Sequence, residues 1–141
     1  MKTINEIQDE IIEEFEPLED WMDRYQMLID MGSDLPTLPD ELKTEQNLID
    51  GCQSRVWLVC DDGDDGRLTF RAESDALIVR GIVALLLRIF SGQRAADILA
   101  ADLYFISRIG LSDHLSPTRA NGLLAMVKQI RAYALAMQAT A

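Results

Sequence analysis

The sequence predicts an α+β domain in which helices pack around a small antiparallel three-stranded sheet. Three observations support this prediction: apolar residues recur at helical spacing near both ends, strand-forming residues alternate in the middle, and a nearly continuous apolar segment follows them. With 141 residues, the chain is long enough to bury one core and too short for two comfortable ones. We therefore expect one domain over residues 1–141.

Two helices are predicted at the start of the chain. Thr3 and Glu6 have the spacing of a capping box, and they precede apolar residues at helical intervals: Ile4, Ile7, Ile11 and Phe15. This helix is expected to end near Pro17. A second helix is expected over residues 19–31, with Gly32 suited to its C-terminal cap.

The middle of the chain changes character. Residues 33–46 contain prolines and no sustained period, which indicates an irregular loop. Residues 47–50 and 55–60 are predicted strands, and residues 51–54 between them have turn chemistry. Residues 67–73 alternate apolar and polar side chains, as in a strand with one face exposed. The simplest arrangement of the three segments is a meander.

The remaining part of the chain, nearly half of it, is predicted to be helical. Ser74 or Asp75 can cap a helix that runs through residues 76–86 and is apolar on nearly all sides, which places it at the centre of a core. Short helices follow, and Ser116 and Pro117 supply the cap and the first turn of a final helix.

Composition excludes several classes of function. Lys and Arg number 13 against 24 Asp and Glu, giving a net charge of −11, which argues against nucleic-acid binding. The first residues lack the pattern of a signal peptide, and Arg80 and Arg88 interrupt the longest apolar segment, which is too short to span a membrane. We expect a soluble cytoplasmic protein with no membrane partner. Two cysteines are too few for a disulfide framework.

Cys52 is the strongest candidate for chemistry. It lies between Gly51 and Gln53 at a predicted turn, off any apolar stripe, where a thiol can be presented to another protein; an incidental turn cysteine is the alternative. Arg55 would favour the thiolate. Cys60 instead continues a strand pattern and is interpreted as structural. An extended strand separates the two thiols by about 18 Å, which argues against a disulfide or a metal site built on both.

His114 and Arg119 are weaker candidates. His114 is the only histidine, and pairing it with Cys52 would give a thiol enzyme, but no signature in the sequence brings the two together. A loop histidine with a local hydrogen bond is the simpler interpretation. Arg119 lies in the first turn of a helix, where the helix dipole disfavours a cation. It is expected to serve a partner, an anion or a carboxylate.

Three segments resemble blocks of one known family. The segment Gly51-Cys52-Gln53-Ser54-Arg55-Val56-Trp57 resembles the specific cysteine-bearing motif of SufE-type proteins. Residues 74–81 and 114–123 resemble two further family blocks in the same order, so the resemblance spans nearly the whole chain. It implies a SufE-like domain whose α+β fold is similar to that of the IscU scaffold.

The resemblance implies a function as a sulfur acceptor. SufE-like proteins take sulfur from a cysteine desulfurase, SufS- or CsdA-like, stimulate it, and relay the sulfur toward an iron–sulfur scaffold. Cys52 would carry the sulfur as a transient persulfide. The protein would be an accessory factor rather than an enzyme. It would need no cofactor or metal of its own, since the pyridoxal phosphate belongs to the desulfurase.

The same resemblance implies further site residues that shape the loop or contact the partner: Gly51, Gln53, Ser54, Arg55, Asp75, His114 and Arg119. Cys60 departs from the single-cysteine pattern of the family. Two alternatives stay open, a metal-binding iron–sulfur scaffold or zinc protein of IscU-like fold, and a thiol enzyme that uses Cys52 and His114.

Overall fold

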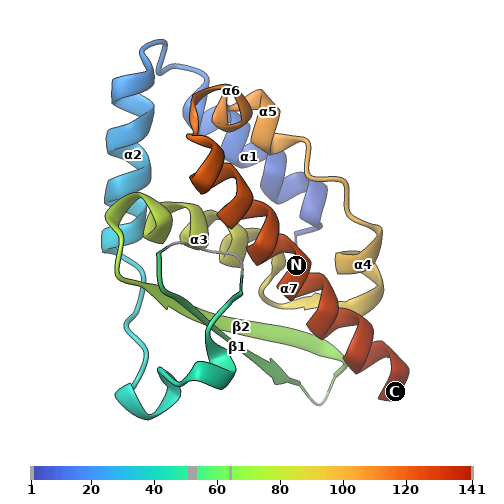
Figure 1. Ribbon diagram of the computed structural model, residues 1–141. Coiled ribbons are helices and arrows are strands. Elements are labelled where there is room, and N and C mark those ends of the chain that lie inside the picture. Colours follow the sequence, from blue (N-terminus) through green and yellow to red (C-terminus); the bar gives the residue numbers. More distant parts are fainter. Residues whose placement is uncertain (1, 51–53, 64, 141) are drawn as a thin grey trace.

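The computed structural model describes residues 2–50, 54–63 and 65–140. Along the chain its elements are α1 (Ile4–Phe15), α2 (Trp21–Ser33), the 3-10 helices η1 (Asp40–Leu42) and η2 (Glu45–Asn47), β1 (Val56–Asp62), β2 (Arg67–Ser74), α3 (Leu77–Phe90), β3 (Gln93–Arg94), α4 (Ala95–Ala100), α5 (Phe105–Arg108), α6 (Leu111–His114) and α7 (Pro117–Thr140). In Figure 1 the helices α1, α2 and α3 lie above the sheet, and the segment with η1 and η2 lies below it. The predicted α+β class is confirmed.

The sheet has three antiparallel strands in the order β1-β2-β3, but its third strand is not the predicted one. Of the predicted strand at 47–50, Leu48 forms an isolated bridge to Trp57. The third strand is instead β3, which pairs with the start of β2. The predicted meander is therefore wrong, because β3 joins the sheet only after the chain has passed through α3.

The core is centred on α3 and includes buried residues of the sheet, α1 and α7. Alternating residues of β2 face it, namely Leu68, Phe70 and Ala72, as the sequence pattern predicts. α3 is buried along most of its length, which confirms its predicted central position. The predicted capping box at the start of α1 is also present, since Thr3 and Glu6 exchange side-chain-to-backbone hydrogen bonds of 3.1 Å.

Gly32 does not end α2, contrary to the prediction. The helix continues to Ser33, and Gly32 is buried where α2 crosses α3. A Cβ atom on Gly32 would lie 2.6 Å from the backbone nitrogen of Gly81. A Cβ atom on Gly81 would lie 2.1 Å from the carbonyl oxygen of Leu28. Both glycines are therefore required for the two backbones to touch.

Residues 34–50 run across the outer face of the sheet. Leu35 and Leu38 are buried, so this segment is held against the domain. Among the described residues, no helix is both long and apolar enough to cross a bilayer.

Candidate functional site

Three of the predicted site residues, Ser54, Arg55 and Asp75, lie where β1 begins and β2 ends. Gly51, Cys52 and Gln53 lie outside the described residues. Ser54 is half-buried and Arg55 is exposed. Because Ser54 follows Cys52 by two positions, chain connectivity keeps their Cα atoms within about 7 Å. Ser54 is therefore the described residue that follows the candidate thiol most closely along the chain.

Two chain segments flank the motif: the incoming arm (residues 34–50) and the outgoing arm (residues 54–57). They are paired with each other. On the incoming arm, the backbone N–H of Ile49 donates to the carbonyl of Val56 at 2.8 Å, and Leu48 bridges Trp57. Ile49 and Val56 are both buried. The connection that contains Cys52 thus begins and ends on a hydrogen-bonded pair of arms anchored in the core.

Asp75 fixes the outgoing arm. Its Oδ1 accepts from the backbone N–H of Arg55 at 3.1 Å, and its own N–H donates to the Arg55 carbonyl at 3.3 Å. Asp75 therefore does not cap α3, and the N-cap residue is Ala76, for which no side-chain cap bond is found among the described residues. The hydroxyl of Ser74 accepts from the Ala76 N–H at 3.3 Å. The prediction that Asp75 lies near the loop fits this geometry.

Removing the Asp75 carboxylate should loosen this arm. We expect Asp75→Ala to speed amide hydrogen exchange at Arg55 by about tenfold, since the lost bond to a charged acceptor is worth about 1.5 kcal/mol. Asp75→Asn keeps an oxygen acceptor and serves as the control. Equal exchange in the alanine variant and the unaltered protein would show that the arm is held by other contacts.

Ser54 and Arg119 meet at one cavity. The cavity has a volume of about 260 Å³ and lies between α3 and the first turns of α7. Val79, Ile82 and Met126 provide apolar walls, while polar groups come from Ser54, Ser116, Thr118 and Arg119. The Ser116 hydroxyl accepts from the Arg119 backbone N–H at 3.3 Å, in agreement with the predicted cap. The fold thus brings together two predicted site residues that are far apart in the sequence.

Arg119 is oriented by α2. Its guanidinium Nη1 donates to the hydroxyl of Tyr25 at 2.9 Å. Tyr25 packs edge-on against Trp21, with 6.4 Å between ring centroids. Sequence reasoning did not connect either aromatic residue with Arg119. No local pattern signals the contact, because it joins residues 94 positions apart.

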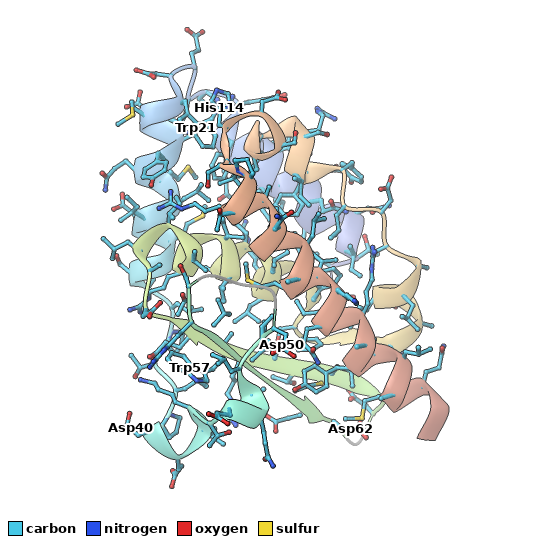
Figure 2. All side chains as sticks on the ribbon, viewed as in Figure 1. Trp21, Asp40, Asp50, Trp57, Asp62 and His114 are labelled. Carbon is cyan, nitrogen blue, oxygen red and sulfur yellow. The ribbon has the colours of Figure 1, made fainter. Side chains whose placement is uncertain are left out.

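His114 occupies a different position. Its ring stacks on Trp21 at 4.3 Å between centroids, and its Nδ1 lies 2.9 Å from the carbonyl oxygen of Gly110 (Figure 2). His114 does not line the cavity that Ser54 and Arg119 share. The contacts of His114 join α6 to α2, and its local hydrogen bond is the one that the sequence suggested.

Cys60 lies at the far end of β1 and is half-buried opposite Phe70. Burial, and then the charges of Asp61 and Asp62, raise the pKa of the Cys60 thiol to about 11. Because the thiolate is the nucleophile, this thiol is a poor one near neutral pH. The position agrees with the interpretation of Cys60 as structural.

The raised pKa predicts slow alkylation of Cys60. In a Cys52→Ser background, we expect iodoacetamide to modify Cys60 at least about tenfold more slowly than free cysteine at pH 8. The thiolate forms as the pH rises toward the pKa of about 11. The rate should therefore keep increasing above about pH 9.5, where alkylation of free cysteine levels off. Mass spectrometry of timed samples measures both rates, and a plateau near about pH 9 would contradict the raised pKa.

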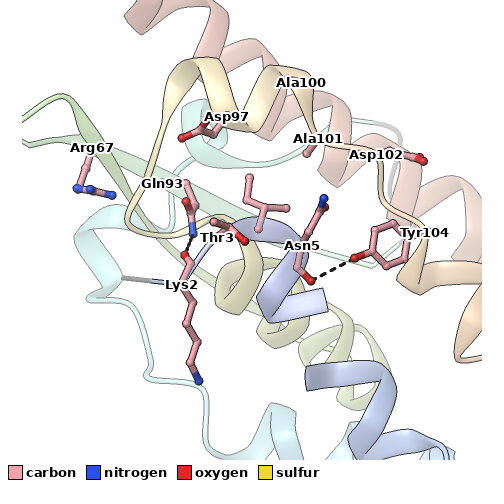
Figure 3. A pocket seen from close by; sticks show the side chains of 11 residues that line it. Lys2, Thr3, Asn5, Arg67, Gln93, Asp97, Ala100, Ala101, Asp102 and Tyr104 are labelled. Atoms are coloured by element: carbon pink, nitrogen blue, oxygen red, sulfur yellow. Dashed lines mark hydrogen bonds between the residues drawn. The ribbon is translucent and has the colours of Figure 1, made fainter. Parts of the chain in front are cut away.

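A second, larger cavity of about 500 Å³ lies elsewhere, between the N-terminus of α1, β3 and α4 (Figure 3). The Gln93 side-chain amide donates to the backbone carbonyl of Lys2 at 3.1 Å, and the Tyr104 hydroxyl donates to the backbone carbonyl of Asn5, also at 3.1 Å. None of the predicted site residues that the structure describes lines this cavity. Within the described residues, no cluster of three or more His, Cys, Asp and Glu side chains could hold a metal ion.

Comparisons with known proteins show the family to which the chain belongs. The model of the family "SufE: Fe-S metabolism associated domain" matches residues 9–134. An uncharacterized SufE-like protein of Rhizobium meliloti (strain 1021) is 48% identical over 130 residues, covering 89% of this chain and 93% of the relative. Another SufE-like protein, from Rhizobium etli, is 46% identical over 127 residues, which cover 87% of this chain and 86% of the relative.

The fold has a solved counterpart. The solution structure of a hypothetical protein from Thermus thermophilus matches with a TM-score of 0.75 and 21% identity, covering 94% of this chain and 96% of that one. At this identity the match shows the fold alone. The family model and the two relatives identify the chain: it belongs to the SufE family, which is associated with iron–sulfur metabolism.

Proposed function

We propose that this protein accepts sulfur from a cysteine desulfurase on Cys52, thereby stimulates the desulfurase, and relays the sulfur to iron–sulfur cluster assembly. The observation that carries the proposal is the motif Gly51-Cys52-Gln53-Ser54, whose described end, Ser54, lines a cavity together with Arg119. Membership of a family associated with iron–sulfur metabolism supports it.

The transfer is a thiol exchange that needs no oxidant or reductant. The Cys52 thiolate attacks the outer sulfur of a persulfide on the desulfurase. The sulfur–sulfur bond of that persulfide breaks, and its electron pair leaves on the desulfurase cysteine as a thiolate. A new sulfur–sulfur bond forms at Cys52. The proton of the outer sulfur stays with it, so Cys52 ends as a persulfide and the desulfurase is ready for another turnover.

The cavity beside Ser54 suits a persulfide. Apolar side chains from α3 and α7 form part of its wall, and a reactive outer sulfur held against them would be less exposed to small thiols and oxidants. The Arg119 guanidinium at the rim favours an anion over a neutral sulfur, because opposite charges within a few ångströms stabilise the charged form. The site thus combines shelter with a preference for negative charge.

The partners and cofactors follow from the same proposal. The desulfurase, SufS- or CsdA-like, holds the pyridoxal phosphate, and this protein acts as an accessory without a cofactor of its own. An iron–sulfur scaffold receives the sulfur afterwards. A thiol that must stay reduced between cycles suits the cytoplasm.

Intact-mass analysis tests the proposal. The protein is incubated with a candidate desulfurase and free cysteine, and its mass is measured before and after addition of dithiothreitol. We expect a gain of one sulfur atom that dithiothreitol removes, and a rise in desulfurase turnover. An unchanged mass in the presence of a desulfurase that carries its own persulfide would contradict sulfur acceptance.

A further inference from the structure

We propose that Glu73 is a positioning residue for sulfur transfer, because it fixes the chain segment that leads into the cysteine motif. This inference rests on the proposed function. Glu73 lies near the end of β2, two residues before Asp75, and does not itself line the cavity beside Ser54.

Glu73 is a buried carboxylate with two partners on one distant segment. The residue is only 8% exposed. Its Oε1 accepts from the backbone N–H of Leu38 at 2.9 Å, and its Oε2 pairs with Lys43 Nζ at 2.6 Å. Both partners belong to residues 34–50, which cross the outer face of the sheet. A single side chain thus holds two points of the segment that enters the motif.

Trp57 joins the same cluster from the motif itself. It is the cross-strand neighbour of Glu73 in the β1–β2 ladder. The Lys43 ammonium lies 5.9 Å from the centre of the Trp57 ring, within the range of a cation–π contact. In Figure 2, Trp57 lies below the strands beside the segment that carries Asp40. Leu48 then pairs with Trp57 by its backbone bridge. The cluster therefore ties the incoming arm to β1.

The end of β2 consequently holds both arms of the motif. Glu73 holds the incoming arm through Leu38 and Lys43, and Asp75 holds the outgoing arm through Arg55. Since Glu73 and Asp75 are separated by one residue, the spacing of the two arms is set by a short, rigid piece of backbone.

The charge of Glu73 is maintained despite its burial. Burial alone would raise the pKa of Glu73, but the hydrogen bonds from Lys43 and the Leu38 amide outweigh it and hold that pKa below its ordinary value. A buried ion pair gives little net stability, because desolvation offsets the attraction. The ion pair instead favours one arrangement of the chain over others. A site for thiol exchange needs such a fixed arrangement.

The test compares two variants of the same strand. Glu73→Gln keeps the side-chain size and an oxygen acceptor for Leu38, but removes the ion pair with Lys43. Arg71→Gln is the matched control, since it removes the Arg71–Asp61 pair, 3.4 Å long, from the same face of the sheet and away from the motif. Both variants are assayed for persulfide formation over a range of desulfurase concentrations.

We expect Glu73→Gln to lower the maximal rate of sulfur transfer by about 10- to 100-fold, with the half-saturating desulfurase concentration changed by less than about twofold. Arg71→Gln should leave both quantities within about twofold.

Amide exchange at Ile49 gives a readout that does not depend on sulfur chemistry, and it should accelerate in Glu73→Gln only. Lys43→Met, which keeps the aliphatic stem, should show the same pattern and replaces Glu73→Gln if that variant does not fold.

Two results would overturn the inference. One is a Glu73→Gln variant that transfers sulfur at the rate of Arg71→Gln, and the other is a loss confined to the half-saturating concentration. A Cys52→Ser sample in the same assay separates this failure from failure of the proposed function. Persisting transfer in that sample rejects sulfur acceptance at Cys52, whereas its loss together with an unaffected Glu73→Gln rejects only the positioning role.

Discussion

Replacement of Cys52 by serine is expected to abolish sulfur acceptance and stimulation of the desulfurase. A hydroxyl remains protonated at neutral pH and cannot attack a persulfide sulfur at a useful rate, whereas a thiolate can. The loss should exceed about 1000-fold in the rate of persulfide formation, because the altered atom is the nucleophile itself. Intact-mass analysis after incubation with desulfurase and cysteine measures it directly.

Cys60→Ser is the matched control for Cys52→Ser. It removes the other thiol, whose pKa is raised to about 11 by burial and by two neighbouring aspartates. This variant should accept sulfur at nearly the unaltered rate. Sulfur gained by Cys52→Ser, or a comparable loss in Cys60→Ser, would show that the reactive thiol has been misassigned. Chemical denaturation should show little change in the free energy of unfolding for Cys52→Ser, which separates a chemical loss from a folding defect.

Gly81→Ala is expected to give a large loss of stability. The added methyl group would lie 2.1 Å from the carbonyl oxygen of Leu28, so α2 and α3 must move apart. Helix propensity alone would favour alanine by about 1 kcal/mol, but overpacking a rigid contact costs about 1–3 kcal/mol or more. We expect a net decrease of about 2 kcal/mol in the free energy of unfolding, measured by urea denaturation.

The sign of the change in the free energy of unfolding of Gly81→Ala shows whether overpacking or helix propensity dominates. Ala84→Gly in the same helix removes a methyl group and adds no volume, and it should lower the free energy of unfolding by about 1 kcal/mol through propensity. If Gly81→Ala raised stability by a similar amount, propensity would dominate and the two backbones would not be in contact. A decrease in both variants agrees with the close approach described above.

Local signals in the sequence were sufficient for much of the fold. The capping box of Thr3 and Glu6, the alternation along β2 and the apolar character of α3 each act within a few residues, and each is present in the structure. Gly32 was misinterpreted because a glycine that ends a helix and one that lets two helices touch have the same local appearance. Only the position of Gly81 on α3 distinguishes them.

The third strand was mispredicted for a related reason. β3 is only two residues long and has no strand pattern of its own, since its pairing with Arg67 and Leu68 depends on how α3 returns the chain to the sheet. The site shows the same limit. The motif around Cys52 is visible in the sequence, but the meeting of Ser54 with Arg119, and of Arg119 with Tyr25, depends on tertiary packing.

The crossing of α2 and α3 has a consequence for how the native molecule opens. Two helices in backbone contact at Gly32 and Gly81 cannot separate gradually, so their amides should exchange only with global unfolding. Residues 34–50 depend on a few buried side chains and one carboxylate, and they should open at lower free energy. This segment can therefore open while the helical scaffold stays folded.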